Sequence, residues 1–123
     1  MRIAALDAEA WDQLRLLERP ERPGTLARVL LLYLRNAEDL HARIHAAHRA
    51  GDCGELHRAL HNLRASSASV GASALAALLR PWEQDAKVGV DVLDAGRLAA
   101  IADELAAVER ALRARLGELP QSL

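Results

Sequence analysis

Phenylalanine is absent from this chain of 123 residues, and aromatic side chains make up only 2% of it. A core must therefore be built from leucine, alanine, valine and isoleucine, a composition that favours helices. No stretch shows the sustained alternation of apolar and polar residues that marks a strand. The length suffices for one hydrophobic core and no linker divides it, so we expect residues 1–123 to form a single domain.

The chain also has little cysteine and almost no excess of charge of either sign. The single cysteine, Cys53, excludes an internal disulfide and fits a reducing compartment. Basic and acidic residues number 16 and 17, and the net charge of −1 provides no field to attract nucleic acid or an anionic membrane. The longest apolar run, 29–34, is too short to cross a bilayer, and the amino terminus lacks a signal-peptide pattern. We therefore expect a cytoplasmic protein with no nucleic-acid partner and no membrane insertion.

Apolar residues recur at helical spacing in several stretches, which predicts an all-α fold. The expected helices cover residues 7–18, Thr25 to near Gly51, Asp52 to about residue 68, about residue 73 to Gly89, and Asp91 or Asp94 to Pro120. Four substantial helices with short connections pack most simply as an antiparallel bundle. The short helix at the amino terminus is then expected to cap one end of this four-helix bundle.

Polar residues at the helix starts indicate where these helices begin. Thr25 is expected to be the N-cap of the second helix, and Asp52 with Glu55 three residues later forms a capping pair for the third. Pro81 lies inside the fourth helix, where it removes a backbone donor and predicts a kink or a local defect.

The third helix contains the most informative stretch, residues 61–72, with the sequence HNLRASSASVGA. At 100° per residue its apolar positions cluster on one side, and His61 points away from them towards water. The neighbours of His61 on this outward face are His57, Arg58, Arg64, Ala65 and Ala68. Small residues leave the imidazole open to a partner, and basic residues can balance an anion placed on it. This pattern suits phosphorylation of the imidazole.

These residues resemble the signature of the histidine-containing phosphotransfer (HPt) domains, which runs roughly H-x-L-K-G-x-x-x-x-x-G-A. His61 falls on the phospho-accepting histidine, Arg64 on the lysine, Gly71 on the turn glycine, and Glu83 on a later glutamate of the family. Ala65 departs from the pattern, because the family usually has glycine there. The helical layout extends the resemblance over nearly the whole chain.

The resemblance implies a phosphorelay intermediate of two-component signal transduction. His61 would accept a phosphoryl group from an aspartate of a receiver domain and pass it to another receiver. Arg64, Arg58 and His57 would stabilise the phosphoryl group or assist docking, as would the small Ala65 and Ala68. The chain would not be an enzyme and would need no cofactor, because the receiver supplies Mg²⁺. The expected partners are a response-regulator receiver domain, a hybrid sensor kinase, or both.

A rival interpretation is a non-catalytic helical interaction domain. His41, His45 and His48 lie on one side of the second helix and are a candidate surface metal site, but no further ligand accompanies them, so we predict no metal. Leu31 and Leu34 lie off the predicted core stripe and are candidates for a docking or dimer patch under either interpretation. The sequence leaves the oligomeric state open.

Overall fold

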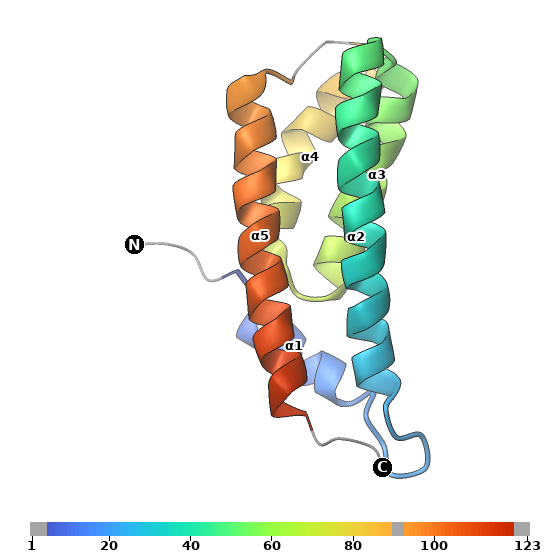
Figure 1. Cartoon of the computed structure of the whole chain (residues 1–123), viewed down its shortest axis with the longest axis vertical. Coiled ribbons are helices and arrows are strands. Elements are labelled where there is room, and N and C mark those ends of the chain that lie inside the picture. Colours follow the sequence, from blue (N-terminus) through green and yellow to red (C-terminus); the bar gives the residue numbers. More distant parts are fainter. Residues whose placement is uncertain (1–4, 90–92, 120–123) are drawn as a thin grey trace.

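The computed structural model describes residues 5–89 and 93–119, and these residues form helices without strands. The helices are α1 (Ala8–Arg15), α2 (Thr25–Ala50), α3 (Cys53–Ser69), α4 (Ser73–Lys87) and α5 (Ala95–Glu118). The last four run antiparallel as a bundle, and α1 lies at one end of it (Figure 1). The predicted fold class is confirmed. Among the described residues no helix is both long and apolar enough to span a membrane.

Helix α1 occupies a place that unequal helix lengths leave open. With 17 and 15 residues, α3 and α4 are shorter than α2 and α5, so the turn between them stops short of the bundle end, beside α1 (Figure 1). The Asp7 N–H donates to the Gly71 carbonyl oxygen at 2.7 Å. Gly71 has a φ of +79°, and a Cβ there would lie 2.9 Å from that of Ala10. Glycine therefore permits both the turn and the close approach of α1.

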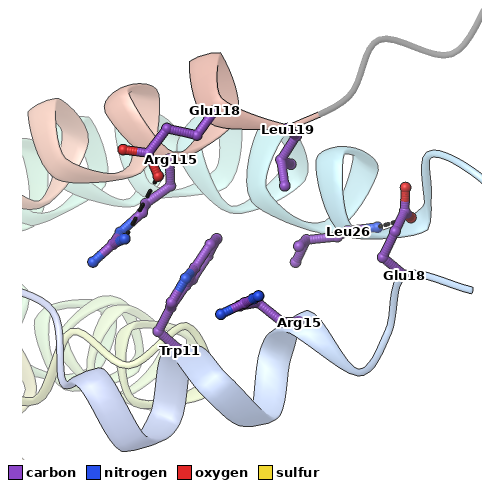
Figure 2. A pocket seen from close by; sticks show the side chains of 7 residues that line it. All are labelled: Trp11, Arg15, Glu18, Leu26, Arg115, Glu118 and Leu119. Carbon is purple, nitrogen blue, oxygen red and sulfur yellow. Dashed lines mark hydrogen bonds and ion pairs between the residues drawn. The ribbon is translucent and has the colours of Figure 1, made fainter.

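Trp11 anchors α1 to the bundle. Its indole is 7% exposed and belongs to the core cluster. It borders a cavity of about 420 Å³ between α1 and the end of α5 (Figure 2), with the Arg115 guanidinium 5.2 Å from the ring centroid. Both arginines at this cavity have acidic neighbours, because Arg115 pairs with Glu118 and Arg15 with Asp12. Packing of Trp11 thus holds α1 at this end of the bundle, while each ion pair lies within a single helix.

Two of the predicted N-caps are confirmed, and one is wrong. The Asp52 and Asp94 carboxylates accept hydrogen bonds from backbone N–H groups of α3 and α5. Thr25 does not cap α2, because Gly24 is the N-cap and provides no side chain. Glu18 takes over this role by accepting from the N–H groups of Gly24 and Leu26. The alternative cap Asp91 and the predicted stop at Pro120 lie outside the described residues.

The core follows the predicted apolar stripes, with one correction. Leu34 is 5% exposed and belongs to the core, so it contributes to no docking patch, whereas Leu31 is half exposed. Both α3 and α5 pack against α2, which widens its buried face beyond a single stripe. Helix α4 continues through Pro81 to Lys87 without ending there. This proline costs α4 one backbone hydrogen bond, not its continuity.

A polar contact inside the core fixes α2 against α3. The Tyr33 hydroxyl lies 2.8 Å from the Ser67 hydroxyl, and both side chains are buried. Desolvation raises the pKa of Tyr33 to about 12, which outweighs the opposing hydrogen bond to Ser67. The native structure therefore holds the protonated phenol.

Tyr33 should make the chain less stable in alkali. Its pKa rises on folding from 10.0 to about 12, so its contribution to stability is complete below pH 10 and is lost as the pH rises towards 12. Because this is the only tyrosine in the chain, absorbance near 295 nm measures its ionisation directly. The folded chain should ionise well above pH 10, and the urea-unfolded chain near 10. Equal midpoints in the two states would contradict the burial of the Tyr33 phenol.

Candidate functional site

A glutamate inside the bundle organises the polar cluster between α3 and α4. The Glu83 side chain, on α4, is only 4% exposed. Its carboxylate faces α3, where it accepts hydrogen bonds from both His61 and Arg64. A buried carboxylate is tolerated where such partners replace its lost hydration. The sequence pattern shows why it lies here, because Glu83 falls on the apolar stripe of α4, between Leu79 and Ala86.

His61 is held at one ring nitrogen and free at the other. Its Nδ1 atom lies 2.5 Å from Glu83 Oε1, while the side chain remains 49% exposed. An ionised carboxylate can only accept, so the Nδ1 atom carries the proton in this contact. In the neutral imidazole the lone pair is then on Nε2. Glu83 therefore fixes both the tautomer and the orientation of the ring, as a carboxylate does for a metal-ligating or catalytic histidine.

Arg64 completes the pair with Glu83. Its Nε atom donates to Oε2 and its Nη2 atom lies 3.3 Å from Oε1, a bidentate arrangement. Burial raises the pKa of Glu83, but the hydrogen bonds from Arg64 and His61 outweigh it, and the net pKa lies below the ordinary value. The same hydrogen bond raises the pKa of Arg64. Glu83 is consequently ionised at neutral pH, and Arg64 lies 3.3 Å from the His61 ring.

A second imidazole, that of His57, is hydrogen-bonded to the same glutamate. The His57 Nδ1 atom lies 3.1 Å from the backbone oxygen of Glu83, and because a carbonyl oxygen only accepts, Nδ1 is the donor. The His57 and His61 rings are stacked with an interplanar angle of 29° and centroids 6.1 Å apart. One residue of α4 thus orients two neighbouring imidazoles of α3.

The outward face around His61 matches the prediction in part. Ala65 and Ala68, one and two turns further along α3, are exposed and leave the approach to His61 open. Arg58 is not brought to His61. Its guanidinium pairs with Glu55, which also binds Arg43 of α2. This ion-pair cluster draws Arg58 towards the start of α3.

The spacing of apolar and polar residues did not by itself identify Glu83 as part of the site. Only the family resemblance pointed to Glu83, and it did not predict the burial or the contact with Arg64. An acid in the middle of an apolar helical stripe was the signal available. Such a residue needs a partner on the facing helix, and α3 supplies two.

The other histidines lie away from this cluster. The Nε2 atoms of His41 and His45 lie 3.2 Å apart on α2. Among residues 5–89 and 93–119, no three histidine, cysteine or acidic side chains are grouped to hold a metal ion. The structure thus brings together two members of the candidate triplet.

Comparison with known proteins identifies the class of protein. The sequence model of the Hpt domain matches residues 28–117, most of the chain. The chain therefore belongs to the Hpt domain family, and it is a phosphorelay intermediate of two-component signalling. Members of this family are phosphotransfer carriers, not classical enzymes, and they interact with receiver domains and kinases.

A solved structure agrees with this assignment at the level of the fold. The chain is similar to the crystal structure of histidine-containing phosphotransfer protein B (HptB) from Pseudomonas aeruginosa PAO1, with a TM-score of 0.85 and 21% identity. The match covers 97% of this chain and 100% of that one. A search of the curated proteins found no match.

Glu83 should make the chain less stable at acidic pH. Its pKa lies below the unfolded value of 4.5, so its contribution is complete above that pH and is lost as the pH falls through the lowered pKa. Glu83→Gln should lower the free energy of unfolding at pH 7 by about 1–3 kcal/mol and remove this part of the acid dependence. Urea denaturation at pH 7 and at pH 3.5 measures both effects.

Glu38→Gln is the matched control, because Glu38 is an exposed glutamate on α2. This substitution should change stability by less than about 0.5 kcal/mol. If both variants keep the acid dependence of the wild type, the Glu83 cluster does not contribute to stability.

Proposed function

We propose that His61 carries the phosphoryl group of the relay. The observation that supports this is the contact between its Nδ1 atom and the buried Glu83 carboxylate, which leaves Nε2 with its lone pair on an exposed ring. A nucleophile needs such a lone pair and a fixed direction, and a rigid helix provides the second.

The transfer begins with attack by Nε2 on the phosphorus of a receiver's aspartyl phosphate. An N–P bond forms, the P–O bond to the aspartate breaks, and the carboxylate leaves. No proton has to leave the ring during the attack, because the proton stays on Nδ1. The positive charge that develops on the imidazole is balanced by Glu83, which is ionised already.

Return of the phosphoryl group to a second receiver reverses these bond changes. Arg64 lies beside the ring and is suited to balance the phosphoryl charge, and His57 presents a second imidazole on the same side. In this proposal the receiver supplies the aspartate and Mg²⁺, so this chain needs no nucleotide or metal site for the transfer. We propose a receiver domain, free or within a hybrid sensor kinase, as the partner, and the cytoplasm as the compartment.

Phosphoryl labelling tests the acceptor. Mixing the chain with a panel of phosphorylated receiver domains should yield acid-labile, base-stable phosphate, as expected of a phosphohistidine. His61→Gln should abolish the label and retain the helical content measured by circular dichroism. His57→Gln, one turn away on the same face, is the matched control and should still be labelled. Labelling lost in His57→Gln but kept in His61→Gln would assign the acceptor to His57. Absence of label from every receiver would favour the rival interaction domain.

The open face beside His61 should be needed for docking. In-line transfer brings the receiver aspartate close to the imidazole, and the small exposed side chains of Ala65 and Ala68 permit that approach. Ala65→Leu and Ala68→Leu should slow transfer at least about tenfold without unfolding the chain, measured as the rate of label transfer. Ala65→Gly should keep or raise the rate and cost about 1 kcal/mol of stability at most.

Ala114→Leu serves as the steric control, because Ala114 is exposed on α5, away from the cluster. It should transfer at the wild-type rate. Wild-type rates in both Ala65→Leu and Ala68→Leu would mean that the receiver reaches His61 from another side.

A further inference from the structure

A pair of imidazoles outside the relay site lies on α2. His41 and His45 are one turn apart, half-buried, and their rings meet edge to face with centroids 4.9 Å apart. Their Nε2 atoms point at one another across 3.2 Å. His41 also experiences the charge of Glu109 of α5, which places the pair beside the α2–α5 contact.

The separation of the two Nε2 atoms matches that of two ligands on one metal ion. Zinc–nitrogen bonds measure about 2.0–2.1 Å. Two nitrogens at such an ion are therefore about 2.9 Å apart at a right angle and about 3.3 Å apart at the tetrahedral angle. The observed 3.2 Å lies between these values. The spacing of the two nitrogens is thus already suited to a shared cation, and binding requires each ring to rotate until its lone pair points at the ion instead of at the other ring.

We propose that His41 and His45 form a two-point chelate for a divalent transition-metal ion of the Zn²⁺ and Cu²⁺ type, through their Nε2 atoms. Imidazoles four residues apart on a helix are a recurrent zinc-binding arrangement. Water completes the coordination, because the described residues offer no group of three suitable side chains. The sequence interpretation argued against a three-histidine site for lack of further ligands, and a two-histidine chelate needs fewer.

The surroundings favour a cation at this place. Glu109 adds negative charge nearby without being a ligand in the structure. The site is independent of the relay proposed for His61, which lies between α3 and α4.

The chain contains its own control for the spacing. His57 and His61 are also four residues apart, but Glu83 binds both of their Nδ1 atoms. Their rings are nearly parallel, with centroids 6.1 Å apart, and do not converge on a common point. Sequence spacing alone would therefore predict two sites, whereas the geometry predicts one.

Isothermal titration of the full chain with zinc chloride at pH 7.5 tests the proposal. The wild type should bind one ion, and His41→Ala and His45→Ala should each weaken binding at least about tenfold, because each removes half of the chelate. His57→Ala and Cys53→Ser should bind as the wild type does. Wild-type affinity in His45→Ala, loss of binding in either control, or no binding by the wild type would overturn the proposal.

If an alanine variant unfolds, NMR of the imidazole nitrogens of the wild-type chain tests the proposal without any substitution. Zinc should shift the Nε2 resonances of His41 and His45 and leave those of His57 and His61 in place. Shifts confined to other histidines would equally overturn the assignment.

Discussion

The site depends on a carboxylate that the bundle holds out of water. Burying Glu83 is costly by itself, and Arg64 and His61 compensate by donating to its two oxygens. The contact with Glu83 also orients the His61 ring. Because Glu83 binds Nδ1, Nε2 is the ring nitrogen that remains exposed. The chemistry of the exposed atom is thus set by a residue on the neighbouring helix, behind the ring.

Helix α3 is positioned by polar contacts on two sides. Glu83 of α4 binds one side, and Tyr33 of α2 reaches Ser67 on another. Both contacts require a particular rotation of α3, because a turn of the helix by one residue would remove them together. Apolar packing supplies most of the stability of such a bundle, but leucine stripes tolerate small rotations. The buried polar pairs are therefore the more specific restraint on where His61 points.

The helices and most caps could be predicted from the sequence, because their determinants are local. Asp52 and Asp94 cap the helices that they directly precede, and the leucine stripes follow the helical period. Glu18 was missed because it caps α2 from six residues before Gly24, across a turn whose path no local pattern reveals.

The wrong predictions for Arg58 and Leu34 have a related cause. Arg58 can reach either His61 or Glu55 from the same backbone, and the choice depends on the side chains of Glu55 and Arg43, which spacing does not determine. Leu34 is buried because neighbours cover α2 on more than one side. The spacing of apolar residues shows which face of a helix is buried, but it does not show how many helices pack around that face.

The two imidazoles of the site are anchored to Glu83 by different atoms. His57 binds its backbone oxygen, and His61 binds its side chain. Any residue at position 83 offers the carbonyl, whereas only an acid offers the carboxylate. Sequence drift at this position would consequently release His61 while His57 stayed anchored. The contact between the two helices through His57 therefore needs only the backbone at position 83. The reactivity of the exposed His61 ring depends on the side chain at the same position.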